Sequence, residues 1–190
     1  MMTTEHRQPA MPADTGLNAT WLIDSCPTDV LLTPGDGRPG VRVALHVLID
    51  RYSRRMLVSV TPGPSDASAL ALVHRGIEAW GTPEEIRTDL WADLRSAQRA
   101  TTLAALGIHR GMVRPYTLYQ KPLVERAIRT VLAVLPGLAT RAVARLQARI
   151  DQWAECTYAH APQPGLDGKS PAEMASEWQG HAARAGNPQA

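Results

Sequence analysis

The hydrophobic period changes along this chain, and that change restricts the possible folds more than any other feature of the sequence. From Val41 to Ile49, apolar residues occupy every second position, which is typical of a strand with one buried face. A later segment has apolar residues at every third or fourth position, which is typical of an amphipathic helix. These residues are Leu70, Val73, Ile77 and Trp80. The chain therefore combines strands and helices.

Turn residues between these segments divide the rest of the chain. We expect strands at residues 20–32, 41–49, 56–60, 85–88 and 108–113. We expect helices at residues 65–80, 94–106, 122–135 and 138–158. The short connections between the first three strands predict an antiparallel meander. The whole order predicts an α/β fold with a mixed sheet.

The length of 190 residues fits one domain. We expect a core at residues 18–178, with disordered tails at 1–17 and 179–190. No apolar run approaches the roughly 20 residues that a membrane span needs, and the N-terminus lacks the hydrophobic stretch of a secretory signal. The two cysteines, Cys26 and Cys156, are far apart, which favours free thiols. These features favour a cytoplasmic protein that does not bind a membrane.

Positive charge is concentrated in the second half of the chain. The net charge is only +2, but residues 95–149 contain ten Lys or Arg residues and a single acidic residue, Glu125. A basic half-chain is typical of a protein that binds a partner rich in phosphate, such as a nucleic acid. The alternative is a set of solvated helix faces in a protein rich in Arg and Ala.

Three acidic residues in different contexts are candidates for chemistry. Asp24 closes the apolar run that starts at Trp21, Asp89 follows a predicted strand, and Glu125 lies within a predicted helix. A carboxylate in an apolar strand is costly unless it is paired or bound to a metal, and ligands collect where strands end. Three carboxylates brought together can hold two divalent cations, which can cut and rejoin a phosphodiester.

Each acidic residue also has a structural interpretation. Asp24 fits an exposed position on the polar face of a half-buried strand, and Asp89 fits a helix cap, with Asp93 as a rival for either role. Glu125 has a basic residue four positions before it and another four after it, the spacing of ordinary surface ion pairs. Asp50, at the end of the second strand, is more typical of a structural ion pair than of a metal ligand.

Seven sequence elements, in order, resemble the catalytic core of the DDE transposase and retroviral integrase superfamily, over about residues 21–178. They are Trp21-x-x-Asp24, Leu48 to Arg54, Gly81-Thr82-Pro83 leading to Thr88-Asp89, Leu106-Gly107-Ile108, Arg114-Pro115-Tyr116, Lys121 to Arg126, and Gly165 to Glu173. The stretch from Asp24 to Val30 and the Lys121 to Arg126 segment look most like bacterial transposases of the phage Mu kind.

The resemblance implies an RNase H-like fold, a five-stranded mixed sheet flanked by helices. It implies that Asp24, Asp89 and Glu125 are the catalytic residues and hold two Mg²⁺ ions, with Mn²⁺ as a substitute. The ions would activate a water or a 3′-hydroxyl and stabilise the leaving 3′-oxygen, so that the same site cleaves a DNA 3′-end and then transfers it to target DNA. Lys121, Arg126 and Arg129 are the expected DNA contacts.

The resemblance also implies partners. DNA ends and target DNA are expected to assemble a homo-oligomer, and an ATPase is a possible partner. Transposases of this kind carry helical DNA-binding domains before the core, and residues 1–17 are too few for one. We therefore expect an excised core, a subunit that uses a separate DNA-binding subunit, or a remnant.

One motif departs from the family pattern. Where the family usually has Asp-Asn-Gly, this chain has Asp89-Leu90-Trp91, without the glycine that adopts unusual backbone angles freely. Two alternatives to a DNA-joining enzyme therefore stay open. One is a catalytically inactive remnant that serves as a DNA-binding or assembly module, and the other is a simple RNase H-like nuclease.

Overall fold

The computed structural model describes residues 16–32, 39–63, 66–88, 97–112, 121–138 and 140–185. Five strands form one sheet in the order β3-β2-β1-β4-β5. Their bounds are β1 Thr20–Leu32, β2 Val41–Asp50, β3 Met56–Pro62, β4 Glu85–Thr88 and β5 His109–Met112. The first three strands are antiparallel, while β4 pairs in parallel with both β1 and β5. The mixed sheet and its antiparallel meander are confirmed.

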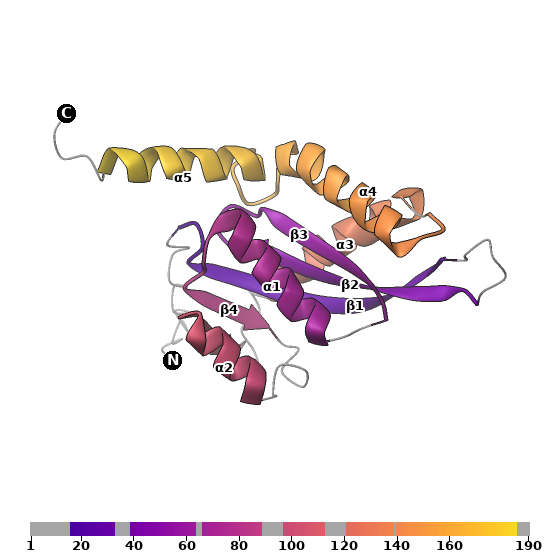
Figure 1. Cartoon of the computed structure of the whole chain (residues 1–190). Coiled ribbons are helices and arrows are strands. Elements are labelled where there is room, and N and C mark those ends of the chain that lie inside the picture. Colours follow the sequence, from indigo (N-terminus) through magenta and orange to yellow (C-terminus); the bar gives the residue numbers. More distant parts are fainter. Residues whose placement is uncertain are drawn as a thin grey trace, which may run out of the picture.

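Helices cover both faces of this sheet (Figure 1). Their bounds are α1 Asp66–Trp80, α2 Ala97–Ala105, α3 Lys121–Leu138, α4 Val143–Cys156 and α5 Pro171–Ala185, with a short 3₁₀ turn, η1, at Tyr158–His160. Among the described residues, no helix is both long enough and apolar enough to span a lipid bilayer. Cys26 and Cys156 are free, as expected.

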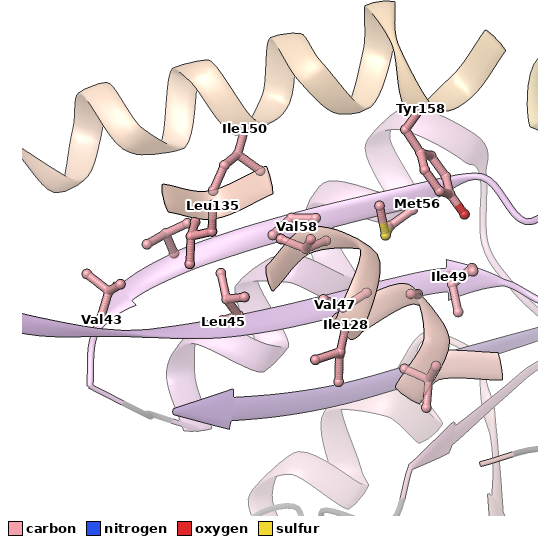
Figure 2. Packing of buried hydrophobic residues seen from close by; sticks show 14 of the residues in the cluster. Val43, Leu45, Val47, Ile49, Met56, Val58, Ile128, Leu135, Ile150 and Tyr158 are labelled. Carbon is pink, nitrogen blue, oxygen red and sulfur yellow. The ribbon is translucent and has the colours of Figure 1, made fainter. Parts of the chain in front are cut away.

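The period-two pattern of β2 explains the larger of two cores. Val43, Leu45, Val47 and Ile49 point to one face, where they meet Ile128 and Leu135 of α3 and Ile150 of α4 (Figure 2). On the opposite face, Trp21, Ile23 and Leu48 meet Leu72 of α1 and Leu103 of α2. With no Phe in the chain, branched aliphatic side chains fill most of both cores.

Two predicted helix boundaries were wrong. We expected the third helix to stop at Leu135, but α3 includes Pro136 and ends at Leu138. Pro136 has no backbone N–H to donate to the Leu132 carbonyl oxygen, and the helix ends two residues later. The next helix begins at Val143 rather than at residue 138, since Ala142 is extended with φ −131° and ψ 135°.

The last helix runs past the expected end of the core. Ser170 and Glu173 form a capping box at its start, with the Ser170 backbone N and Oγ donating to Glu173 Oε2 at 2.7 and 2.8 Å. These hydrogen bonds hold the pKa of the Glu173 carboxyl below its usual value. The helix continues to Ala185, through a stretch rich in alanine, into a range that we expected to be a tail.

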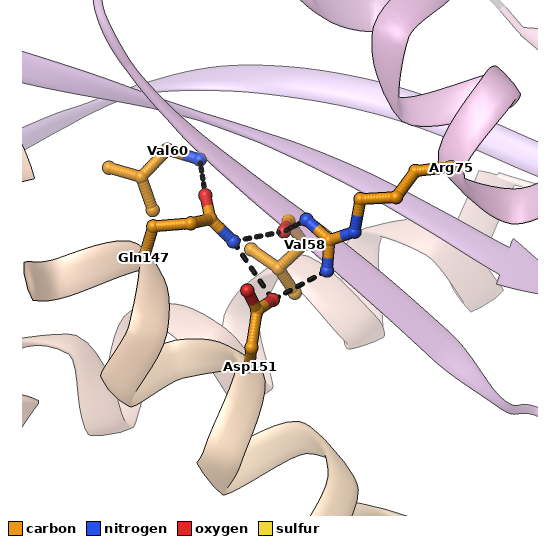
Figure 3. A network of polar contacts seen from close by, with 5 residues as sticks. All are labelled: Val58, Val60, Arg75, Gln147 and Asp151. Carbon is orange, nitrogen blue, oxygen red and sulfur yellow. Dashed lines mark hydrogen bonds and ion pairs between the residues drawn. The ribbon is translucent and has the colours of Figure 1, made fainter. Parts of the chain in front are cut away.

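Side chains from both helical layers cover the edge of the sheet at β3 (Figure 3). Gln147 of α4 accepts a hydrogen bond from the Val60 backbone N at 2.8 Å and donates one to the Val58 carbonyl oxygen at 2.9 Å. Arg75 of α1 donates to the same Val58 oxygen at 3.1 Å and pairs with Asp151 of α4 at 2.5 Å. The outer backbone groups of two β3 residues are thereby satisfied without another strand.

Candidate active site

Asp24 lies in the middle of β1, on the sheet face that α3 covers. It stands between Leu22, which belongs to the core under α3 and α4, and Cys26, which packs against that core. Alternate residues of a strand share a face, so the Asp24 carboxylate points to the same side as these two neighbours. Asp24 is only half-buried, unlike the three residues before it. The sheet therefore presents a partly exposed carboxylate beside an apolar core.

The immediate surroundings of Asp24 fit an ionised carboxylate. Its Oδ1 accepts a hydrogen bond from the Ser25 backbone N at 2.7 Å. Burial, and then the negative charge of Asp24, raise the pKa of the Cys26 thiol. Cys26 therefore stays protonated next to Asp24. The atom that could bind a metal ion at this point is a carboxylate oxygen of Asp24, not the Cys26 sulfur.

The parallel pairing of β1 and β4 brings a second strand end close to Asp24. Trp21 pairs with Ile86 and Leu22 with Arg87, and Thr88 is the last residue of β4. The end of β4 is thus level with the part of β1 that leads into Asp24. Asp89 is the next residue in the chain, and both it and its rival Asp93 lie outside the described residues.

Glu125 lies in the first half of α3, which packs over β1 and β2. Val124 and Ile128 on either side of it are buried in the core, whereas Glu125 is half-buried at the border of that apolar face. The helix therefore holds the Glu125 carboxylate over the same side of the sheet as Asp24. The structure brings these two predicted ligands to one face.

The residues predicted to contact DNA all belong to α3. Arg126 and Arg129 are both exposed, and the side chain of Lys121 lies outside the described part of the structure. Arg129 Nε donates to the backbone carbonyl oxygen of Glu125 at 3.5 Å, which keeps its guanidinium on the Glu125 side of the helix. Thr130 Oγ1 donates to the carbonyl oxygen of Arg126 at 2.9 Å.

The donor atoms of the predicted site suit Mg²⁺, which prefers hard carboxylate oxygens. Asp24 and Glu125 supply such oxygens from a strand and a helix that pack together. Within the described residues, no three His, Cys, Asp or Glu side chains form a group that would hold a metal ion. The predicted trio has only two members in that part of the chain, and the metal-binding role of all three stays a prediction.

Asp50 has a structural role, as its sequence context suggested. It is fully buried and accepts hydrogen bonds from the Asn18 backbone N at 3.0 Å and from Ser53 N and Oγ at 2.9 and 2.7 Å. Its charge also acts on Arg55, where it opposes the effect of burial, which lowers the pKa of that guanidinium. Asp50 thus fixes the turn between β2 and β3.

We did not predict one charged pair that lies near the candidate site. Arg87 pairs with Leu22 in the sheet and so lies on the same face as Asp24, where its Nη2 contacts Glu85 Oε2 at 2.7 Å. Gly111 of β5 leaves room for the pair, because a Cβ there would lie 1.9 Å from Glu85 Oε1. The signal in the sequence was the alternation of charged Glu85 and Arg87 with buried Ile86 and Thr88.

Solved structures that resemble this one include retroviral integrase cores. The HTLV-2 integrase catalytic core, solved in complex with magnesium in a trimeric form, matches with a TM-score of 0.64 at 17% identity, over 85% of this chain and 98% of that one. The BIV integrase catalytic core matches with a TM-score of 0.60 at 18% identity, over 88% and 99%. This chain has the fold of a retroviral integrase catalytic core.

The integrase-core fold is RNase H-like, as the sequence predicted. It also occurs in a simian T-cell lymphotropic virus intasome bound to the PP2A regulatory subunit B56 gamma, with a TM-score of 0.66 at 18% identity, over 84% of this chain. The chain spans about half of that integrase, since 55% of its length is covered. No family model and no curated protein matches the sequence.

Proposed function

We propose that this chain is a metal-dependent polynucleotidyl transferase core that cleaves DNA 3′-ends and joins them to target DNA. One observation carries the proposal, namely that Asp24 stands in the middle of β1, level with the end of β4, on the face over which α3 holds Glu125. Asp89, which follows β4 in the sequence, is proposed as the third carboxylate. The integrase-core fold supports the same reaction class.

Each residue has a distinct role in this proposal. Asp24, Asp89 and Glu125 hold two divalent ions, which would activate the attacking water or 3′-hydroxyl and stabilise the leaving 3′-oxygen. Asp24 is fixed by the β1 pairing and by Ser25 N, while Glu125 is fixed by the packing of α3. Lys121, Arg126 and Arg129 contact DNA phosphates. No covalent enzyme intermediate is needed.

The proposal extends to partners and setting. The partners are the DNA ends and the target DNA, on which several copies of the chain assemble, and a separate DNA-binding subunit or an ATPase. From the sequence resemblance, we infer that this chain is a bacterial transposase of the phage Mu type and acts in the cytoplasm.

Two assays on the purified full chain test the proposal. The first measures nicking of supercoiled plasmid in Mg²⁺ or Mn²⁺, and the second measures joining of duplex oligonucleotide ends to plasmid DNA. Asp24→Asn, Asp89→Asn and Glu125→Gln should each lower both rates about a thousandfold or more, since each removes charge that the ions need. Asp29→Asn is the matched control, because Asp29 is an exposed β1 carboxylate that pairs with Arg42 on the surface.

The outcomes separate the alternatives. Nicking without joining identifies an RNase H-like nuclease. Absence of both activities, together with DNA binding that Asp89→Asn leaves unchanged, identifies a remnant that serves in binding or assembly. Full activity of Asp24→Asn contradicts the proposed site itself.

A further inference from the structure

The candidate active site depends on where β4 lies along β1. β4 has only four residues, and it pairs with β1 at Thr20, Trp21 and Leu22. A slip of one residue in this pairing would turn each β4 side chain to the opposite face of the sheet. Asp89 follows β4 in the sequence, so the register of β4 sets the point from which the chain continues to Asp89.

One residue at the start of the sheet, Asn18, joins three parts of the fold through its side chain. Its Nδ2 donates to the carbonyl oxygen of Trp80, the last residue of α1, at 2.6 Å. Its Oδ1 accepts from Trp21 Nε1 of β1 at 3.1 Å and from Arg55 Nη2, next to β3, at 2.5 Å. Because Trp21 is fully buried, its ring N–H would be left without a partner if this oxygen were removed.

The backbone of Asn18 is fixed as well. Its φ is 61°, in the left-handed region that asparagine adopts more readily than most residues with a side chain. Its N donates to Oδ1 of the fully buried Asp50 at 3.0 Å, and its carbonyl oxygen accepts from Glu84 N at 2.8 Å. Both backbone polar groups and both polar side-chain atoms of Asn18 therefore have a partner elsewhere in the fold.

The contact with Glu84 passes the position of Asn18 on to the parallel strands. Glu84 comes directly before β4, and its own carbonyl oxygen accepts from the N of His109, the first residue of β5, at 2.8 Å. Glu85 N donates to the carbonyl oxygen of Ala19 at 3.2 Å. A row of hydrogen bonds therefore crosses from the residues before β1, through the start of β4, to the start of β5.

We propose that Asn18 is a positioning residue, which locks the register of β4 on β1 and thereby sets the distance between Asp24 and Asp89. The side chain of Asn18 is held by α1, β1 and Arg55 at once, so its carbonyl oxygen offers Glu84 a fixed point of attachment. Only the link to the metal-binding carboxylates rests on the proposed function, whereas the hold on β4 does not.

Two substitutions separate the side chain of Asn18 from its backbone. Asn18→Gly keeps the left-handed conformation at no steric cost but removes all three side-chain hydrogen bonds. Asn18→Asp is the conservative variant, because it keeps an oxygen for Trp21 and Arg55 and loses only the donor to Trp80. Ser170→Ala is the matched control for lost stability, since it removes a capping side chain from α5, which lies apart from β4 (Figure 1).

Hydrogen exchange measured by NMR on the full chain tests the hold on β4. In Asn18→Gly, the Glu84 and Glu85 amides should exchange about tenfold faster than in the native chain, because the start of β4 opens more easily. Rates taken relative to the amides of β2 discount a general loss of stability. On this relative scale, Asn18→Asp should lie between Asn18→Gly and the native chain, and Ser170→Ala should match the native chain.

The Mg²⁺ dependence of plasmid nicking tests the link to the candidate site. Misplaced carboxylates bind metal ions more weakly, so Asn18→Gly should need about tenfold more Mg²⁺ for half-maximal nicking. Asn18→Asp should recover part of the native response, and Ser170→Ala should need no more Mg²⁺ than the native chain. Affinity for duplex DNA, measured by fluorescence anisotropy without divalent metal, should stay unchanged in Asn18→Gly, because the proposed DNA contacts belong to α3.

The outcomes keep the two parts of the inference apart. Native relative exchange rates at Glu84 and Glu85 in Asn18→Gly overturn it entirely. Faster exchange with an unchanged Mg²⁺ requirement, or an equal Mg²⁺ shift in Ser170→Ala, overturns the positioning of the carboxylates. A native chain that does not nick DNA loses the proposed function, while faster exchange at Glu84 in Asn18→Gly still supports the hold of Asn18 on β4.

Discussion

At the scale of single residues, the buried side chain of His46 couples the stability of the fold to pH. It is 2% exposed, with Nδ1 2.5 Å from Ser25 Oγ and Nε2 3.1 Å from Thr61 Oγ1. Thr61 donates its hydroxyl hydrogen to the Gly63 carbonyl oxygen at 2.7 Å, so Thr61 accepts from Nε2–H and Ser25 donates to Nδ1. This arrangement holds the neutral ring, and burial lowers the pKa of His46.

A lowered pKa in the folded state makes stability depend on pH in a defined direction. Below the unfolded-state pKa of about 6.5, the unfolded chain binds a proton at this position that the folded chain does not. The contribution of neutral His46 is complete above that pH and is lost as pH falls through the folded-state value. The free energy of unfolding should therefore rise with pH just below 6.5, by at most about 1.4 kcal/mol per pH unit.

Urea denaturation between pH 5 and pH 7.5 measures this effect. His46→Gln removes the titrating group, so its stability should change less with pH in that window than that of the native chain. Equal slopes for the two proteins would show that His46 is not responsible. Exposed His74 provides the control, since His74→Gln should retain the native slope.

At the scale of elements, α1 approaches the sheet closely through Gly76. A Cβ at this position would lie 2.7 Å from Leu48 Cδ2 and 2.8 Å from Trp21 Cζ3, and both side chains are fully buried. Gly76→Ala gains about 1 kcal/mol of helix propensity but forces buried groups apart, which typically costs about 1–3 kcal/mol. Because Leu48 and Trp21 have no space to yield, we expect a net loss of stability.

Gly137 in the last turn of α3 is the matched comparison. No atom lies within 4 Å of a Cβ built there, so Gly137→Ala gains propensity without a clash. Thermal unfolding should show a lower Tm for Gly76→Ala and a higher Tm for Gly137→Ala. A rise in Tm for both would mean that α1 moves away from the sheet at little cost.

The covered edge of β3 gives a second prediction for an element. Gln147→Leu removes both hydrogen bonds to the outer backbone groups of Val58 and Val60. Unsatisfied groups of this kind cost about 1–3 kcal/mol, and an uncovered strand edge pairs with other chains. Urea denaturation should show the loss of stability, and light scattering should show association. Gln152→Leu, at an exposed position of the same helix, should leave the hydrogen bonds at the β3 edge intact.

At the scale of the whole molecule, the sequence predicted the sheet well. The bounds of β1 and β4 and the antiparallel meander agree with the structure, because turn residues and apolar periodicity marked them clearly. The start of α4 was predicted poorly, since Ala and Arg residues before Val143 fit a helix and a loop equally well. Periodicity shows which face is buried, but it does not show where hydrogen bonding begins.

The site was predictable only in part, for a related reason. Asp24 and Glu125 stood out because each interrupts an apolar pattern, and the structure brings them to one side of the sheet. Asn18 gave no such signal, because neither its left-handed backbone nor its contact with Trp80, 62 residues away, is visible in local sequence. The metal-binding roles of Asp24, Asp89 and Glu125 all stay predictions.

The covered edge of β3 has one further consequence. A backbone amide on the margin of a sheet normally exchanges its hydrogen with deuterated solvent through brief local fraying. The Val60 amide is held by Gln147, whose neighbour Asp151 is tied to Arg75 on the opposite layer. We expect its exchange to be slower than that of an uncovered edge amide, because the Gln147 side chain must first leave its contacts with Val58 and Asp151.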